Sequence, residues 1–597
     1  MCGICGVWSP SGQNPSTLTK SLMSEIEHRG PDDSGIVDFH RSNLSLGHVR
    51  LSIIDLDGSP QPMTSTSERF TIVFNGEIYN YEKLRTELNY PFETSGDTET
   101  ILALWEKEGP DCLPKLRGQY AFAIWDSESE ILSFATDAFG ILPIFVYDNG
   151  DTLAFSSSAN SLATQFPEIT KDPEKVETLL TTRAVVAPET AYSGVRRLPP
   201  GSLWTYGKEI KKESFWHQSW NDIAASDSVS QDEKVKKIVQ LLNLAADRAI
   251  TSDVEVGVFL SGGVDSALIA KLAQARLPYQ MNAYTAFWPD EKKSSELDQA
   301  SITARELGLK HHQIAISADD WWDGFLESSK FREGPHAEPA DVVFYLLAER
   351  AKEDVKVVLT GEGADELFGG YPKNRLEQFA SLSLVNKLAS ILLETGIGGG
   401  GEKLGRILYA LSERDSSVRW SRYFSTYWKS DFDLEPHTLP DSELYDPGLR
   451  GMRVFDLTQW LAPLLLDRAD QMAMAHGLEV RPMLLDYDLA NFAFTLNESD
   501  LHSGGQTKPL LRKAAKLILP SDLSSSPKRG FPIPISEWFA GPLYDKVERA
   551  LEISHPALDL VVPIETRLRL LQEEKKHPNR NSKKLFTLVS VINWLSQ

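Results

Sequence analysis

The first part of the chain consists of short apolar runs separated by turn residues. Examples are residues 45–48, 71–74 and 120–125. Short runs bounded by Gly, Asn, Asp or Ser are typical of β-strands. The pattern predicts an N-terminal domain rich in β-strands.

Beyond residue 253, buried strands alternate with helices, which is typical of a parallel sheet covered on both faces. One helix is indicated by Leu297, Ala300, Ala304 and Leu307, which recur at helical spacing before Gly308. The rest of the chain reads as mainly helical, so we expect an α/β domain with a helical C-terminal part. The other expected elements are strands at 254–260, 281–287 and 355–359, a strand beginning near His312, and helices at 266–275 and 342–352.

Both patterns fade at 198–201 (Leu-Pro-Pro-Gly) and along the polar stretch 219–233. A chain of 597 residues is too long for a single hydrophobic core. We therefore expect two domains, one over 2–215 and one over 235–597. The four glycines at 398–401 are expected to form a flexible surface connection.

Composition narrows the range of partners. The formal net charge of −23 repels polyanions, so nucleic acid is a poor candidate. The sequence contains no apolar stretch of membrane-spanning length and no signal-peptide pattern, so no membrane partner is expected. Only three cysteines occur, which suits a reducing compartment and predicts a cytoplasmic location.

Cys2 lies directly behind the initiator Met1. If Met1 is removed, the thiol of Cys2 lies beside its own α-amine, whose pKa of about 8 suits a general base. Alternatively, Cys2 and Cys5 form half of a zinc or redox site, although Cys112 is then the only thiol left. A buried, inert thiol is the third interpretation.

Several sequence blocks accompany Cys2. They resemble, in this order, the glutaminase domain of class II amidotransferases, a group of N-terminal-nucleophile hydrolases. The resemblance implies an α+β domain with an αββα sandwich of antiparallel sheets, and glutamine as substrate. The blocks are Cys2-Gly3-Ile4, 28–33 (His-Arg-Gly-Pro-Asp-Asp), 47–53 (Gly-His-Val-Arg-Leu-Ser-Ile), 74–80 (Phe-Asn-Gly-Glu-Ile-Tyr-Asn) and 96–99 (Gly-Asp-Thr-Glu).

The same resemblance implies that Cys2 attacks the glutamine amide. The side chain of Asn75 and the backbone N–H of Gly76 would hold the oxyanion. Asn-Gly is also the commonest type I′ hairpin turn, and both readings can hold together. Arg50 would grip the α-carboxylate of glutamine and Asp97 its ammonium, with Glu77 shaping the same pocket.

A glycine-rich loop at 261–266 (Ser-Gly-Gly-Val-Asp-Ser) follows the expected strand that ends at Leu260 and opens a helix. Backbone N–H groups and a helix N-terminus in that context favour polyphosphate binding, although a turn without a ligand is the alternative. The loop lacks the lysine of a Walker motif. It resembles the pyrophosphate loop of ATP pyrophosphatases, which split ATP between the α- and β-phosphates to form an acyl-adenylate.

A second motif at 360–371 follows the strand expected at 355–359, at the sheet edge where ligands gather. The resemblance implies that Asp265 and Asp365 hold Mg²⁺ and that Glu362 assists the attack of ammonia. An acidic surface loop is the alternative for Asp365. The ATP-binding residues implied in this way are Leu260, Ser261, Gly262, Gly263, Asp265, Ser266, Gly361, Glu362 and Lys528.

Lys528 lies in 527–532 (Pro-Lys-Arg-Gly-Phe-Pro), which resembles a late basic motif of the same enzymes. It would offset charge on the departing pyrophosphate. A solvated surface lysine is the alternative.

Taken together, the chain resembles the glutamine-hydrolysing asparagine synthetases along nearly its whole length. Their activity implies ATP and Mg²⁺, glutamine, and an internal tunnel for ammonia. It also implies aspartate as the carboxylate acceptor, with amidation of a different carboxylate in a biosynthetic pathway as the alternative. The oligomeric state is left open, with a homodimer as one option.

Four segments depart from the family pattern. Residues 333–340 (Glu-Gly-Pro-His-Ala-Glu-Pro-Ala) replace Asp-Glu-Pro followed by Asp-x-Ser, and 471–475 begins with Gln471 where the family has Arg. Ala138 and Leu142 replace an Arg and a Lys, and 157–160 (Ser-Ser-Ala-Asn) replaces Ser-Glu-x-Lys. These changes bear on the acceptor and on the coupling of the two domains.

Two other functions compete. Intramolecular amide formation occurs in β-lactam synthetases and lasso-peptide cyclases of the same superfamily, but these relatives have usually lost the cysteine nucleophile. A non-catalytic, nucleotide-sensing scaffold is the second alternative. Retention of Cys2, Asp265, Asp365 and Lys528 argues against it.

Overall fold

The computed structural model describes most of the chain. The residues that it does not describe are 11–13, 57, 215–219, 221–222, 224–228, 292–295, 381, 396–401, 428–433, 435–447, 504–505 and 525–531. The glycines at 398–401 and Lys528 therefore lie outside the described residues.

Two antiparallel six-stranded sheets form the N-terminal part, with strand orders β10-β8-β9-β1-β3-β2 and β12-β11-β7-β6-β5-β4. Ile4, Leu46 and Val73 belong to the core between them. The helix α1 (Pro15–Glu25) covers the first sheet and α3 (Asp97–Glu108) the second, which confirms the αββα sandwich. The strands are β1 Gly3–Trp8, β2 Asp33–Phe39, β3 Leu44–Arg50, β4 Met63–Thr64, β5 Phe70–Ile78, β6 Gly118–Asp126, β7 Ile131–Thr136, β8 Phe145–Asp148, β9 Leu153–Ser156, β10 Val195–Arg197, β11 Ser202–Tyr206 and β12 Lys211–Ser214, and the remaining helices are α2 Tyr81–Thr86, α4 Ala159–Gln165 and α5 Val176–Thr182.

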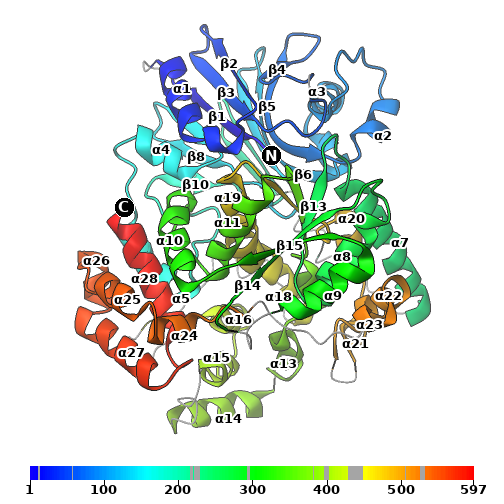
Figure 1. Ribbon diagram of the computed structural model, residues 1–597. Helices are drawn as coiled ribbons and strands as arrows, with labels where there is room; N and C mark the ends of the chain where they lie inside the picture. The colour runs from blue at the N-terminus through cyan, green and yellow to red at the C-terminus, as the bar shows by residue number, and fades with distance from the viewer. Residues whose placement is uncertain are drawn as a thin grey trace.

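A parallel five-stranded sheet, in the order β15-β14-β13-β16-β17, forms the centre of the C-terminal part (Figure 1). Its strands are β13 Val256–Phe259, β14 Asn282–Phe287, β15 Lys310–Ala315, β16 Val357–Thr360 and β17 Glu479–Pro482. Apolar side chains of β13 alternate between the faces: Val258 packs with the helices α7 (Gln231–Ala249), α8 (Val264–Gln274) and α9 (Leu297–Leu307), whereas Phe259 packs with α10 (Ala318–Ser328), α11 (Ala340–Ala351) and α19 (Asp467–Met474). The predicted α/β sheet with both faces covered is confirmed.

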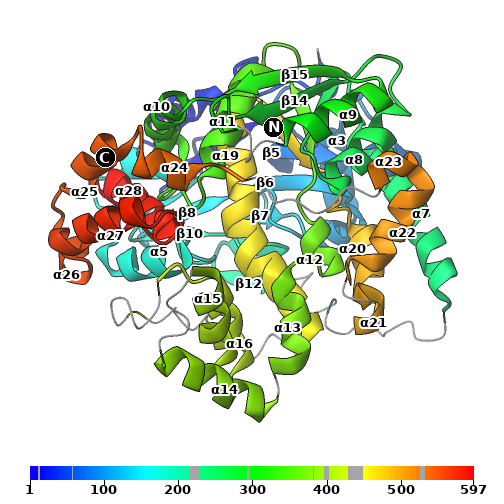
Figure 2. The ribbon, with the colours of Figure 1, turned by 60° about the horizontal axis from the view of Figure 1, so that its bottom comes forward.

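The remaining C-terminal elements are mainly helical, as predicted. Figure 2 shows them spread over several sides of the molecule, with the last helices, in red, beside α5 of the N-terminal part. They are α12 Ala364–Phe368, α13 Pro372–Ala380, α14 Ser383–Glu394, α15 Glu402–Leu411, α16 Ser416–Phe424, α18 Leu449–Phe455, the π-helical segment Asp456–Leu466, α20 Tyr487–Phe494, α21 Glu498–Leu501, α22 Pro509–Ile518, α23 Ser521–Ser524, α24 Ile535–Ala540, α25 Tyr544–Leu551, α26 Pro556–Val561, α27 Ile564–Lys576 and α28 Ser582–Ser596. No helix in the described part of the chain is long and apolar enough to span a membrane.

The expected strands and helices of the parallel sheet are found within a few residues of their predicted bounds. Gly308 ends α9 in the left-handed conformation at φ 68°, as its position predicted. The fifth strand, β17, was missed. Two of its residues, Glu479 and Arg481, are charged yet fully buried, because they pair with each other at 2.5 Å, and this pairing hides the apolar pattern of a buried strand.

One predicted boundary is wrong. Residues 198–201 connect β10 to β11, and both strands belong to the N-terminal sheets. Of the two positions predicted from the fading pattern, only the polar stretch that follows β12 separates the N-terminal sheets from the parallel sheet.

Candidate functional site

The residues predicted to bind glutamine come from four elements that meet at one end of the N-terminal sandwich. Cys2 directly precedes β1, Arg50 ends β3, and Asp97 is the first residue of α3. Asn75 and Glu77 lie on β5, in the second sheet. All five side chains are buried.

Asn75 lies directly beside Cys2. The backbone N–H of Cys2 donates to Asn75 Oδ1 at 2.7 Å, which fixes the orientation of the amide. Asn75 is 0% exposed, and its Nδ2 has no hydrogen-bond partner within the described part of the chain. A buried N–H₂ group without a partner is costly unless a ligand uses it, so Asn75 fits the part of an oxyanion donor.

The alternative interpretation of Asn75-Gly76 as a hairpin turn is wrong. Both residues lie inside β5, where Gly76 pairs with Tyr120 of β6. Gly76 has φ +143°, and a Cβ there would approach the carbonyl oxygen of Gln119 to 2.2 Å. Glycine is therefore required by a distortion within a strand and not by a turn.

The Cys2 thiol is 8% exposed and contacts the carbonyl oxygen of Leu51 at 3.9 Å. Burial raises the pKa of this thiol to about 11, so it is protonated at neutral pH. A base must therefore take its proton before it can attack. Among the described residues no group of three or more His, Cys, Asp or Glu could hold a metal ion, which leaves the zinc interpretation of Cys2 and Cys5 without further ligands.

Met1 ties the N-terminus to the C-terminal part. Its ammonium donates to Glu479 Oε2 at 2.6 Å, and both groups are buried. Figure 1 places the N-terminus between the antiparallel sheets and the parallel sheet. Nearby, Arg29 donates to the carbonyl oxygen of Cys2 at 3.1 Å and to both oxygens of Asp470 on α19. The backbone around Cys2 is thus held from both parts of the molecule.

Arg50, Glu77 and Asp97 complete this site. The guanidinium of Arg50 donates to the carbonyl oxygens of Ile54 and Asp55, at 3.2 and 2.7 Å. Asp97 accepts from the backbone N–H of Ile78 at 2.8 Å, and burial raises the pKa of its carboxyl to about 6. Burial and the neighbouring Asp97 also raise the pKa of Glu77, one of whose carboxylate oxygens has no partner in the described structure.

The glycine-rich loop connects β13 to α8, as predicted. Ser261 and Ser266 bond to each other at 2.9 Å across the loop, and the N–H of Gly263 donates to Ser261 Oγ at 3.2 Å. The N–H of Gly262 donates to a carboxylate oxygen of Glu296 at 3.0 Å. At least one loop N–H therefore already holds an anionic oxygen, the type of acceptor that a phosphate would offer.

Asp265 and Asp365 come together at the carboxyl ends of β13 and β16. Lys508 lies between them, with its Nζ 2.6 Å from Asp265 and 2.7 Å from Asp365. Burial opposes the charge of Lys508, but the two carboxylates outweigh it and raise its pKa. The two aspartates thus converge on one cation position, and carboxylate oxygens of this kind, with phosphates, suit Mg²⁺.

A cavity of about 1010 Å³ lies beside these residues. It is large enough for a nucleotide and has an apolar wall from α11 that includes Val343 and Phe344. Glu362 lines it and accepts from Arg468 of α19 at 3.2 Å. The predicted residues that line it are Leu260, Ser261, Asp265, Ser266, Gly361, Glu362 and Asp365, whereas Gly262 and Gly263 do not line it.

Sequence reasoning missed Lys508, Arg468 and Glu296. Lys508 has a left-handed backbone at φ 54° and lies at the start of α22, a position that no local pattern marks. Each of the three pairs with a residue distant in sequence, so only the fold reveals it.

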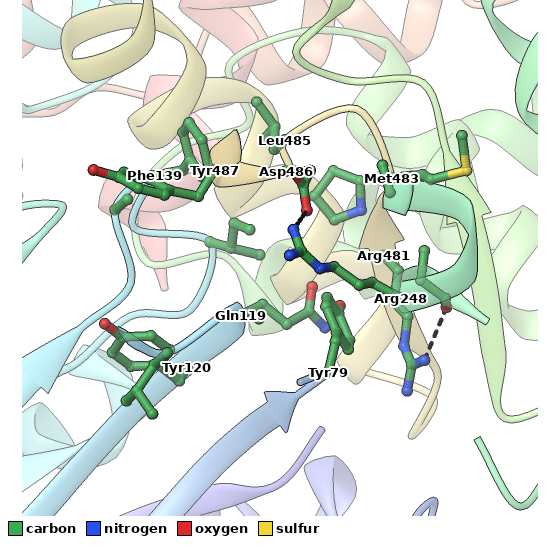
Figure 3. Close-up of a pocket in the computed structure, with 17 residues that line it drawn as sticks. Tyr79, Gln119, Tyr120, Phe139, Arg248, Arg481, Met483, Leu485, Asp486 and Tyr487 are labelled. Atoms are coloured by element: carbon green, nitrogen blue, oxygen red, sulfur yellow. Dashed lines mark hydrogen bonds and ion pairs between the residues drawn. The ribbon is translucent and has the colours of Figure 1, made fainter. Parts of the chain in front are cut away.

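A smaller cavity of about 530 Å³ lies where the two parts of the molecule meet. Figure 3 shows Tyr79 and Gln119 of the N-terminal part facing Arg248 and Arg481 of the C-terminal part. Gln119 is 0% exposed, and neither atom of its amide has a partner among the residues described. Ala138, where the family has Arg, also lines this cavity.

Two models of protein families match the chain. Residues 1–216 match the model of the glutamine amidotransferase domain, and residues 237–596 match that of asparagine synthase.

Individual relatives point the same way. Asparagine synthetase [glutamine-hydrolyzing] 1 of Bacillus subtilis is 31% identical over 100% of this chain and 96% of its own length. A putative asparagine synthetase of Mycobacterium tuberculosis is 32% identical over 100% of this chain and 97% of its own length. Asparagine synthetase B of Escherichia coli is 32% identical over 62% of this chain and 65% of its own length. The chain is therefore an enzyme of the asparagine synthase family, a group of carbon–nitrogen ligases, with an N-terminal glutamine amidotransferase domain.

Proposed function

We propose that the chain hydrolyses glutamine at Cys2 and uses the ammonia to amidate a carboxylate that ATP has activated as an acyl-adenylate. The observation that carries the proposal is the convergence of the two sets of residues: Cys2 with a buried, unpartnered Asn75 amide, and Asp265 with Asp365 at one cation position. The two domains would cover 2–215 and 235–597.

In the glutaminase half, removal of Met1 would leave the α-amine of Cys2 beside its own thiol, and it would also remove the ammonium that Met1 places against Glu479. The α-amine of Cys2 would take the thiol proton, because a thiol with a pKa of about 11 does not ionise alone at neutral pH. Asn75 Nδ2 and the N–H of Gly76 would stabilise the oxyanion.

The same pocket would recognise the amino-acid end of glutamine. Arg50 would bind the α-carboxylate in exchange for the loop carbonyls that it now contacts. Asp97 would bind the ammonium, and Glu77 would shape the pocket. The buried position of all three favours recognition of a fully charged amino-acid group.

In the synthetase half, the loop 261–266 and Gly361 would hold ATP, with the adenine against the apolar wall of α11. Bound Mg²⁺ would supply charge compensation for the phosphates between Asp265 and Asp365. Glu362 would orient ammonia for attack. Lys528, which lies outside the described residues, would offset the charge of the leaving pyrophosphate.

The cavity of Figure 3 supports a route for ammonia between the sites. It lies at the junction of the two parts. The amide of Gln119, which has no partner in the described part of the chain, offers ammonia a hydrogen-bonding group. Ala138 leaves room where an arginine would stand.

Aspartate is our proposed acceptor, because it is the acceptor implied by the names of the relatives. Intramolecular amide formation is the alternative, disfavoured by the intact pocket around Cys2. A cytoplasmic location fits the three cysteines, all of which are free thiols. The proposal leaves the oligomeric state open, with a homodimer as one option.

The test is a product assay with glutamine, Mg·ATP and a panel of carboxylates, aspartate first. We expect glutamate, AMP and pyrophosphate in equal amounts. ADP in place of AMP contradicts the adenylate mechanism, and intramolecular amide formation predicts AMP without consumption of glutamine.

A further inference from the structure

A cavity of about 430 Å³ lies at a different place on the boundary between the two parts, and the mechanism above does not use it. Its N-terminal wall includes Arg183, just after α5, and Arg197 of β10. Its C-terminal wall includes Arg332, Asp467 and Gln471. Asp467 and Gln471 are one turn apart on α19 and share a face of that helix.

Four side chains that line this cavity carry polar atoms without a partner in the described residues. The atoms are Arg183 Nε, Arg332 Nε, Gln471 Nε2 and Asp467 Oδ1. The four residues are only 4%, 5%, 4% and 8% exposed, respectively. Buried polar groups are almost always hydrogen-bonded, so three donors and one acceptor around one cavity indicate a ligand that offers the complementary groups.

The charges around the cavity are mixed. Three arginines line it, Arg183, Arg197 and Arg332, and so do the acidic residues Glu189, Glu333 and Asp467. One guanidinium nitrogen of Arg183 is already paired with Glu338. Arg197 donates to Asp467 Oδ2 at 2.5 Å, which leaves Oδ1 of the same carboxylate to another donor. A simple anion would satisfy the donors but not Asp467, and a simple cation would satisfy Asp467 but leave the three donors without an acceptor. A small zwitterion satisfies both.

Residues at which the chain departs from its family converge on this cavity. Gln471 Oε1 accepts from Arg332 at 2.9 Å and from the N–H of Glu333 at 3.3 Å. Glu333 in turn accepts from the N–H of Asn160 at 2.8 Å. Three of the four departing segments thus form one cluster, which a change of ligand would explain.

The cavity is also a neighbour of the proposed ATP site. Arg468, adjacent to Asp467 on α19, contacts Glu362 in that site. Arg332 lies 3.6 Å from Asp341 on α11, the helix that forms the apolar wall of the nucleotide cavity. A molecule held between Arg332 and Asp467 would therefore lie close to the adenylate.

We propose that this cavity binds a small zwitterion of the amino-acid class. Its carboxylate would accept from Arg183, Arg332 and Gln471, and its ammonium would donate to Asp467 Oδ1. The ligand is either the acceptor that is amidated or an amino acid that regulates the enzyme. Only the first source rests on the proposed function.

Direct binding tests the ligand class on the full-length protein. Calorimetric titrations would compare alanine with propionate and alaninamide, and aspartate with succinate. Each comparison removes one charge and keeps the carbon skeleton. We expect the zwitterions to bind at least tenfold more tightly than their matched analogues. Equal affinities within a set overturn the proposal.

The variant Gln471→Glu locates the binding. It keeps an oxygen for Arg332 and Glu333 but replaces the donor Nε2 with a second acceptor that repels a carboxylate. We expect zwitterion affinity to fall at least tenfold, whereas Gln313→Glu, the same change on an exposed strand residue, leaves it unchanged. Binding unaffected by Gln471→Glu contradicts the site, even if the zwitterions bind elsewhere, for example in the glutamine pocket. Asp467→Asn is the second variant and should weaken the zwitterions but not succinate.

Pyrophosphate release with ammonium as nitrogen donor then separates the two sources. An acceptor is consumed in step with pyrophosphate, and Gln471→Glu raises its KM. A regulator binds without being consumed and changes the rate with another carboxylate. If a zwitterion binds through Gln471 but is neither consumed nor changes the rate, both roles, acceptor and regulator, are overturned. Absence of pyrophosphate with every carboxylate contradicts the proposed function while leaving the binding result intact.

Discussion

The two candidate sites differ in how their polar groups are satisfied before any ligand arrives. Around Cys2, backbone groups of the sheets hold the side chains in place, and the Asn75 amide keeps one nitrogen without a partner among the residues that the structure describes. At the nucleotide loop, the protein supplies its own counterions: Lys508 bridges Asp265 and Asp365, and Arg468 contacts Glu362.

On the proposed function, the first site would be preorganised for charge that develops during the reaction, whereas the second would exchange internal ion pairs for ligand contacts. We therefore expect the glutaminase site to respond sharply to the loss of single atoms. The synthetase site should respond both in activity and in stability, because its ligands replace contacts that support the fold.

The largest expected effect is that of Cys2→Ala. Glutamine-dependent amidation should fall by at least about 10³-fold, because no other nucleophile is placed at the amide, while amidation with added ammonium persists. Both rates are measured as pyrophosphate release. Cys112→Ala, the loss of another buried thiol, should leave both unchanged. Loss of both activities in Cys2→Ala contradicts separate sites.

Asp265→Asn should reverse this pattern. Pyrophosphate release should fall by about 10²-fold, because one of the two carboxylates at the cation position loses its charge. Glutamate release from glutamine alone should persist. The exposed Asp323→Asn is the control. A parallel fall in glutaminase turnover would show that the sites do not act independently.

Lys508→Met should change stability more than it changes glutaminase turnover. Without ligand, this substitution leaves the carboxylates of Asp265 and Asp365 facing each other. We expect the free energy of unfolding to fall by about 1–3 kcal/mol. The loss is smaller than for a fully buried ion pair, because both aspartates are partly exposed. Thermal unfolding with and without Mg²⁺ measures this. Because Mg²⁺ can replace the ammonium, it should restore more stability to Lys508→Met than to the wild type. An equal response of both proteins contradicts a shared cation position.

The smallest expected effect is a dependence on pH. Burial raises the pKa of Asp97 to about 6, so its carboxyl becomes neutral as the pH falls through that value and no longer attracts the ammonium of glutamine. The KM for glutamine should rise about tenfold between pH 7 and pH 5. Asp97→Asn should have a high KM that does not vary in this range. A wild-type KM that is constant from pH 7 to pH 5 contradicts the role of Asp97.

The sequence predicted the elements and motifs whose signals are local. Strand periodicity, the left-handed Gly308 and the order of the glycine-rich loop depend on neighbouring residues, and the structure confirms them. The convergence of Asp265 with Asp365 followed from the rule that ligands gather at the carboxyl edge of a parallel sheet.

Features that depend on distant pairing could not be predicted. The sequence did not predict β17, because two of its residues, Glu479 and Arg481, are charged. They are buried because they pair with each other and because Glu479 also pairs with the N-terminal ammonium. Asn75-Gly76 has the composition of a turn but lies in a strand, since pairing with β6 outweighs the local preference. Lys508 and the departures around Gln471 become meaningful only when the fold brings their partners together.

On the proposed function, one chain frees nitrogen from glutamine and delivers it to a carboxylate activated in its other half. The most direct measurement supplies glutamine labelled with ¹⁵N in its amide, together with Mg·ATP, an acceptor and excess unlabelled ammonium, and determines the label in the product amide by mass spectrometry. We predict ¹⁵N in the product of the wild type and none in that of Cys2→Ala. An unlabelled product from the wild type, despite release of glutamate, would contradict the claim.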